Sequence, residues 1–125
     1  MASPSKRPLF LFFAFATVAA CDDGSSQPAA RDRAVDAVCA RFSACGEVGG
    51  SGDAYASMES CRVDQASVWE KLWPPQECDG RIDPEQLDLC INAINAAECG
   101  EGLDVLNVLL NKCPKSKVCS APADK

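Results

Sequence analysis

Cysteine carries most of the chemical potential of this 125-residue sequence, which holds nine cysteines and no histidine. Thiolates can act as nucleophiles, bind soft metals or exchange with disulfides. No two cysteines have the Cys-x-x-Cys spacing of thioredoxin-like or zinc-knuckle sites, so disulfides are favoured over redox catalysis or metal binding. One cysteine stands apart at position 21, and the other eight fall within residues 39–119: Cys39, Cys45, Cys61, Cys78, Cys90, Cys99, Cys113 and Cys119.

The lack of histidine excludes Ser-His and Cys-His nucleophilic systems and histidine-ligated metals. Two carboxylate pairs remain, Glu77 with Asp79 and Asp83 with Glu85. General acid–base catalysis needs two carboxyl groups in a cleft with shifted pKa values. Acids in the loops of an acidic chain are typically solvated or cap helices, so we predict no catalytic residues and no enzyme activity.

The densest polar cluster is formed by residues 77–83, whose Asp-Gly-x-Ile-Asp core resembles the centre of an EF-hand calcium loop. In that register Pro75 and Gln86 occupy the first and twelfth positions, where calcium needs acidic ligands. A turn followed by a helix cap is therefore favoured, with calcium binding as a minor alternative. We expect no metal and no cofactor.

Two tryptophans, Trp69 and Trp73, lie one helical turn apart just before Pro74. Aromatic residues on one helix face usually belong to the core. An exposed binding patch is the alternative.

The chain begins with an N-terminal leader. Lys6 and Arg7 precede a continuous apolar run over residues 9–18, which small residues follow. This pattern predicts a signal peptide over residues 1–20. The run ends before Asp22 and is too short for a membrane-spanning helix, which needs about 20 apolar residues.

The leader ends in Val18-Ala19-Ala20-Cys21. This stretch resembles the lipobox of bacterial lipoproteins, with valine where leucine is usual. The resemblance implies cleavage before Cys21, a diacylglyceryl group on its thiol and an acyl chain such as palmitate on the new N-terminus. Two or more chains anchor a protein stably in a membrane. An ordinary signal peptidase cut without lipid is the alternative.

Composition supports an exported protein. Removal of residues 1–20 leaves 12 − 2 = 10 basic against 18 acidic residues, a net charge of −8. This acidity argues against nucleic acid partners and against docking on anionic lipid headgroups. With Cys21 modified, eight cysteines remain, enough for four disulfides in an oxidising compartment. We expect a lipid-anchored location in the cell envelope, with inner and outer membrane both open.

The chain divides into a flexible tether over residues 21–30, a helical domain over 31–119 and a polar tail over 120–125. Apolar spacing predicts helices over residues 32–45, 54–73, 83–99 and 103–112, with Asp53 and Asp83 as caps. The alternative for the second helix is a bend or break at residues 64–67. A loop is expected over 76–82 and a frayed segment over 115–125. No stretch alternates with period two, so the predicted fold is all-α, with four helices in two disulfide-stapled hairpins.

Disulfide pairing does not follow from sequence alone. A hairpin folded about residue 50 would pair Cys39 with Cys61, and one folded about residue 101 would pair Cys90 with Cys113. The other four cysteines would then pair among themselves: Cys45, Cys78, Cys99 and Cys119.

The cysteine spacing, Cys39-x5-Cys45-Gly followed by Cys61, Cys78, Cys90-x8-Cys99-Gly and Cys113-x5-Cys119, resembles the small cysteine-rich lipoproteins of myxobacteria and related bacteria. The resemblance covers the whole mature domain and implies location and fold, not activity. The expected function is a membrane-anchored structural or protein-binding lipoprotein with an unknown envelope partner. The alternative is an acidic decoy or inhibitor that blocks a basic site on a partner.

Overall fold

The computed structural model describes residues 26–100, 108 and 111–122. The predicted signal peptide, Cys21 and most of the predicted helix over 103–112 lie outside this part. The helices are α1 (Gln27–Ala44), α2 (Met58–Leu72), α3 (Pro75–Cys78), α4 (Pro84–Ala96) and α6 (Lys115–Val118). The described residues form no strand, only an isolated bridge between Val48 and Tyr55, so the predicted small all-α disulfide-rich domain is confirmed. None of the described helices combines the length and apolar character that crossing a membrane requires.

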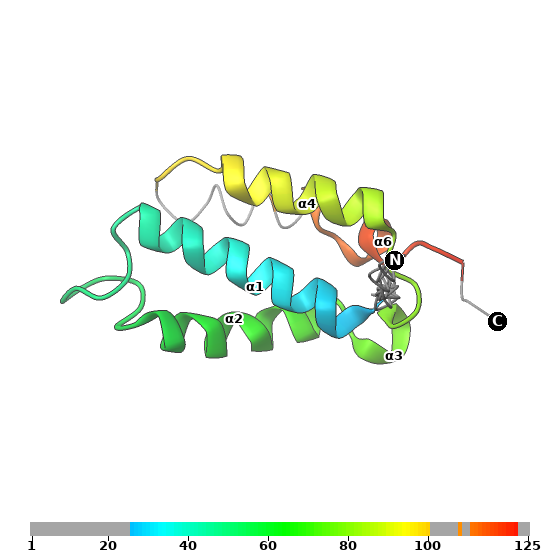
Figure 1. Cartoon of the computed structure of the whole chain (residues 1–125), viewed down its shortest axis with the longest axis horizontal. Helices are drawn as coiled ribbons and strands as arrows, with labels where there is room; N and C mark the ends of the chain where they lie inside the picture. The colour runs from blue at the N-terminus through cyan, green and yellow to red at the C-terminus, as the bar shows by residue number, and fades with distance from the viewer. Residues whose placement is uncertain (1–25, 101–107, 109–110, 123–125) are drawn as a thin grey trace, which may run out of the picture.

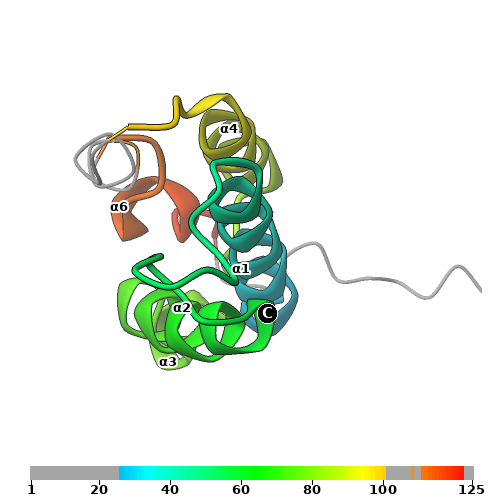
Figure 2. The same cartoon turned by 90° about the vertical axis from the view of Figure 1, so that its left-hand side faces the viewer.

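Helix α1 is the central element and packs between α2 and α4 (Figures 1 and 2). It forms the predicted antiparallel hairpin with α2, and the single turn of α3 then redirects the chain so that α4 runs beside α1 in the same direction (Figure 1). The start of α1 therefore lies at the same end of the domain as α3 and α6. The end of α1, the loop over residues 45–57 and the end of α4 lie at the opposite end (Figure 1).

The two tryptophans form the centre of the core. Trp69 and Trp73 are both 0% exposed, and their ring centroids lie 4.6 Å apart. Trp69 Nε1 donates to Gln65 Oε1 at 3.2 Å, and Trp73 Nε1 donates to the Cys113 carbonyl at 2.9 Å. The prediction that both tryptophans belong to the core is confirmed, and the alternative of an exposed binding patch is wrong. Gln65 is buried and accepts the hydrogen bond from Trp69, and α2 continues through residues 64–67 without a break.

Helix α1 begins earlier than the apolar spacing predicts, so the predicted tether is wrong for residues 27–30. Ser26 is the N-cap and accepts a hydrogen bond from Ala29 N, and a proline lies in the first turn. Ser, Thr, Asp and Asn favour this cap position, and proline tolerates the first turn. Gln27 and Ala30 are buried against the core, which gives these residues a packing role that a tether lacks.

Helix α2 begins later than predicted, at Met58. Ser57 is its cap and forms a reciprocal capping box with Ser60. Asp53 instead accepts a hydrogen bond from Gly50 N at 2.6 Å and closes the preceding turn. The predicted cap at Asp53 is therefore wrong, whereas Asp83 caps α4 as predicted.

The C-terminal segment is more ordered than predicted, because it packs on the start of α4. Val118 is 0% exposed and its carbonyl accepts a hydrogen bond from Asp83 N at 2.7 Å. Ala121 N donates to the Arg81 carbonyl at 3.0 Å. The prediction of a loop over 76–82 is therefore wrong for the residues of α3, and that of a frayed segment over 115–125 is wrong for the residues of α6. The polar tail is hydrogen-bonded at residue 121.

Candidate functional site

The eight cysteines of the domain form four disulfides. The Cys39–Cys61 and Cys90–Cys113 bridges are the two that the hairpin geometry predicts. The remaining bridges are Cys45–Cys99 and Cys78–Cys119. Each joins segments that are distant in sequence, with separations of 54 and 41 residues, and each ties together elements that meet at one end of the domain. Cys21, the predicted lipidation site, lies outside the described residues.

The four bridges differ in exposure. Cys39, Cys61, Cys78, Cys90 and Cys113 are 0% exposed and Cys119 is 8% exposed. In the fourth bridge Cys99 is exposed and Cys45 is half-buried. Three disulfides are therefore core elements, and Cys45–Cys99 is open to solvent.

The exposed bridge borders a cavity of about 440 Å³ at the end of the domain opposite the start of α1. We call this the distal cavity. Apolar side chains from the last turns of α1 and α4 form much of its wall, and charged groups lie among them. The described lining residues are Val38, Arg41, Phe42, Cys45, Glu47, Ala54, Ile94, Ala97, Glu98, Cys99, Gly100 and Val108.

Arg41 connects the cavity wall to the exposed disulfide. Its Nε donates to the Ala97 carbonyl, just past the end of α4. Its Nη2 lies 3.7 Å from Cys99 Sγ. The bond to Ala97 fixes the plane of the guanidinium group, so a permanent positive charge is held against one sulfur.

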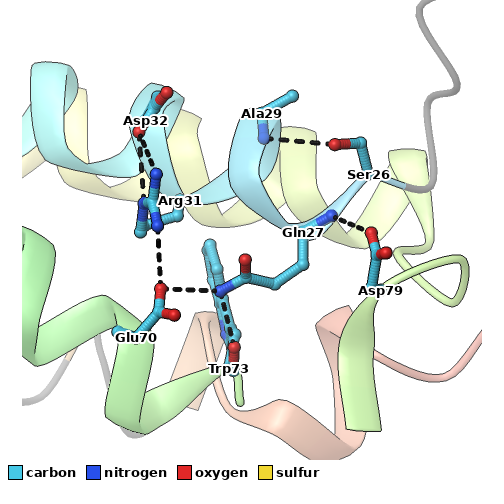
Figure 3. Close-up of polar contacts among 8 residues, drawn as sticks. All are labelled: Ser26, Gln27, Ala29, Arg31, Asp32, Glu70, Trp73 and Asp79. Atoms are coloured by element: carbon cyan, nitrogen blue, oxygen red, sulfur yellow. Dashed lines mark hydrogen bonds and ion pairs between the residues drawn. The ribbon is translucent and has the colours of Figure 1, made fainter. Parts of the chain in front are cut away.

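A polar cluster at the opposite end holds the first turn of α1 in place. We call Ser26, Gln27, Glu70, Trp73 and Asp79 the N-terminal junction (Figure 3). Gln27 is 0% exposed, and its Nε2 donates to the Trp73 carbonyl at 2.7 Å and to Glu70 Oε2 at 3.3 Å. Its backbone N–H donates to Asp79 Oδ1 at 3.1 Å. One residue thus links α1 to α2 and α3.

Glu70 also binds Arg31, whose Nη1 donates to Glu70 Oε2 at 2.9 Å (Figure 3). The hydrogen bond from Arg31, and then the one from Gln27, lower the pKa of the Glu70 carboxyl. The same bond raises the pKa of Arg31. The pair ties α1 to α2 at the edge of the junction, where the Glu70 side chain is 41% exposed.

The lowered pKa of Glu70 predicts a pH-dependent effect of Glu70→Gln. A carboxyl with a lowered folded-state pKa stabilises the fold above its unfolded pKa of about 4.3, and this contribution is lost as pH falls through the folded pKa. We expect the variant to unfold more easily than the parent at pH 7, with the difference closing near pH 3. Urea unfolding at both pH values measures this.

Arg31→Gln supplies the matched control, since it removes the donor rather than the acceptor. If the two side chains are coupled, the variant that carries both Arg31→Gln and Glu70→Gln should lose less stability at pH 7 than the sum of the two single losses. If they are independent, the two losses should add. A difference between Glu70→Gln and the parent that is the same at pH 3 and pH 7 would contradict the assignment.

Three of the four paired acids, Glu77, Asp79 and Asp83, have separate protein partners. Glu77 binds Lys115 Nζ at 2.8 Å, and Asp79 accepts from Gln27 N. Asp83 Oδ1 accepts from the backbone N–H groups of the first turn of α4. Within the part of the chain that the structure describes, no group of three or more His, Cys, Asp or Glu residues is placed to hold a metal ion.

Two residues of these sites are not singled out by sequence patterns. Gln27 lies in the segment that the sequence assigns to the tether, although Ser26 and Pro28 form a recognisable helix start. Arg41 lies on the edge of the apolar face of α1 and contacts groups 56 and 58 residues away. No local signal identifies such a contact.

No curated protein and no solved structure matches the chain. A family model described as a family of unknown function (DUF6184) matches residues 39–121. The match starts at the first bridged cysteine, contains all eight and ends just after Cys119. It covers more than half of the sequence, and the protein therefore belongs to the DUF6184 family.

Proposed function

We propose that this protein is an envelope lipoprotein, held at a membrane by lipid on Cys21, whose disulfide-stapled helical domain binds a protein partner without catalysis. The observation that carries the proposal is the position of the fold relative to the lipobox-like stretch. The N-cap of α1, Ser26, follows Cys21 by only five positions. A lipid on Cys21 would therefore hold the start of α1 close to the bilayer.

The number of residues between Cys21 and α1 limits the distance of the domain from the membrane. A fully extended chain spans at most about 3.6 Å per residue, so Ser26 lies within about 18 Å of Cys21. Helix α1 has 18 residues and rises about 1.5 Å per residue, a length of about 27 Å. The N-terminal junction would face the membrane, and the distal cavity lies at the far end of α1, where a partner has access.

The proposed anchor is lipid rather than headgroup electrostatics. The chain after residue 20 carries a net charge of −8, which an anionic membrane surface repels. Buried acyl chains contribute about 0.8 kcal/mol per methylene and need no basic patch. Membrane binding that survives high salt and is reversed by detergent would be the signature of this anchor.

Cys21→Ser should move the protein from the membrane pellet to the soluble fraction of expressing bacteria, because the variant has no thiol to acylate. Fractionation followed by immunoblotting measures the distribution. Intact mass of the membrane-bound parent should show a chain that begins at Cys21, carries acyl mass and lacks two hydrogens for each disulfide.

Ser25→Ala is the matched control, because it changes a neighbouring residue and keeps Cys21. It should remain in the pellet. The proposal fails if Cys21→Ser stays in the pellet, or if the mature parent has the mass of an unmodified chain.

The salt dependence of partner capture separates binding through apolar surface from the decoy alternative. The lipid-free domain, immobilised on beads, would be exposed to envelope extract and washed at 0.05 and 0.5 M salt. Retention at both concentrations supports an apolar interface. Release at high salt of a basic partner supports the decoy alternative.

A further inference from the structure

We propose that Cys45–Cys99 is a thiol–disulfide exchange site: a dithiol reductant opens it selectively, while the three core disulfides stay closed. The proposal does not depend on the membrane anchor. It follows from three features of this bridge, namely its exposure, the charge beside it and the elements that it joins.

Access to a sulfur comes first, since exchange requires in-line approach of a thiolate to the disulfide. The six cysteines of the other three bridges are 8% exposed or less, so their sulfurs are reached only when the core opens. Cys99 is exposed in the folded state, and both Cys45 and Cys99 border the distal cavity. A reductant can therefore reach this bridge without unfolding the domain.

The second feature is the positive charge of Arg41. Its guanidinium group is held by the Ala97 carbonyl with Nη2 3.7 Å from Cys99 Sγ. A neighbouring cation favours the thiolate over the thiol. Arg41 therefore draws the incoming thiolate anion toward Cys99 in the first step of exchange, and it stabilises the Cys99 thiolate that is released in the second.

The exchange then runs in two balanced steps. A thiolate of the reductant attacks Cys99 Sγ, a mixed disulfide forms, the bond between the two protein sulfurs breaks, and Cys45 leaves as a thiolate. The second thiol of the reductant, deprotonated by solvent, attacks the reductant sulfur of the mixed disulfide. Cys99 leaves as a thiolate beside Arg41, the reductant becomes a cyclic disulfide, and the protein gains two electrons and takes two protons from water.

The third feature is what the bridge holds. Cys45 is the C-cap of α1, and Cys99 lies three positions past the end of α4. The bridge closes the longest sequence separation of the four, 54 residues. Its reduction removes the covalent link between the two helix ends that wall the distal cavity, while Cys39–Cys61 continues to hold α1 against α2. Exchange at this site therefore acts on the distal cavity and leaves the core closed.

Timed reduction tests the proposal on the full-length protein. Free thiols are first blocked with N-ethylmaleimide, which makes the result independent of whether Cys21 carries lipid. Dithiothreitol is then added, newly formed thiols are trapped with iodoacetamide, and the labelled peptides are mapped by mass spectrometry. We expect Cys45 and Cys99 to be labelled about tenfold faster than any other pair. Simultaneous labelling of all eight, or earlier labelling of another bridge, would overturn the proposal.

Arg41 variants test the role of the charge. Arg41→Gln should slow reduction by about threefold, because the variant loses the cation that attracts the incoming thiolate, and exposed charge pairs have effects of about this size. Arg41→Lys should restore most of the rate, and Arg33→Gln, which removes the exposed arginine paired with Asp88, should leave it unchanged. Equal rates in the Arg41→Gln and Arg33→Gln variants would refute the charge effect.

A monothiol reports which sulfur is attacked. Glutathione at limiting concentration should leave a mixed disulfide on Cys99, since this residue is the more exposed of the two. An adduct found on Cys45 instead would overturn the assigned direction.

Discussion

Gln27→Glu should destabilise the domain by about 3–5 kcal/mol at pH 7, the usual cost of an unpaired buried charge. The introduced carboxylate has the shape of the glutamine side chain but cannot donate to the Trp73 carbonyl, which lies 2.7 Å from Gln27 Nε2. Glu70 Oε2 lies 3.3 Å from the same atom and repels it. Arg31, the cation at the edge of the junction, already binds Glu70 and Asp32.

The same substitution should be much milder in acid. Burial and the negative charge of Glu70 raise the folded-state pKa of the introduced carboxyl above its unfolded value of about 4.3. A group with a raised pKa leaves the fold stable below the unfolded pKa, and stability falls as pH rises toward the folded pKa. The gap to the parent should therefore be small at pH 3–4 and widen toward pH 7.

Gln27→Met is the matched control, because it keeps the length of the side chain and adds no charge. It loses the bond to the Trp73 carbonyl, so it should be less stable than the parent by about 1–3 kcal/mol at either pH. Urea unfolding across pH 3–8 compares the three proteins. If Gln27→Glu matches Gln27→Met at pH 7, the junction is not buried as described.

Trp73→Ala should cost about 3–5 kcal/mol, because it removes a 0% exposed aromatic side chain from the centre of the core. It also removes the contact with Trp69 and the donor to the Cys113 carbonyl. Thermal unfolding with disulfides intact, followed by far-ultraviolet circular dichroism, measures the loss.

Trp73→Phe separates volume from hydrogen bonding. It keeps an aromatic ring but leaves the Cys113 carbonyl without its indole donor, so we expect a loss of about 1–3 kcal/mol. A matched change at an exposed apolar position, Val63→Ala, should have a much smaller effect, since Val63 is 69% exposed. Equal losses for Trp73→Ala and Val63→Ala would contradict the core.

The sequence by itself determined the features that depend on neighbouring residues. The spacing of apolar residues predicts α1, α2 and α4, and Asp83 followed by Pro84 predicts the start of α4. A short connection between α1 and α2 makes the helices antiparallel, which is sufficient to predict the Cys39–Cys61 bridge. The DUF6184 match and the resemblance to lipoproteins also come from sequence, and neither depends on the distal cavity or the junction.

Only the tertiary structure decided which polar residues are buried and which disulfide is exposed. Gln27 appears in the sequence as part of a polar tether, but partners 46 and 52 residues away bury it and bond to it. Cys45 and Cys99 lie at or just past helix ends, as the buried Cys78 and Cys119 do, and their exposure depends on where α1 and α4 end in space. Periodicity and capping act within a few residues of the chain, whereas burial and the approach of Arg41 to Cys99 are set by how whole helices pack.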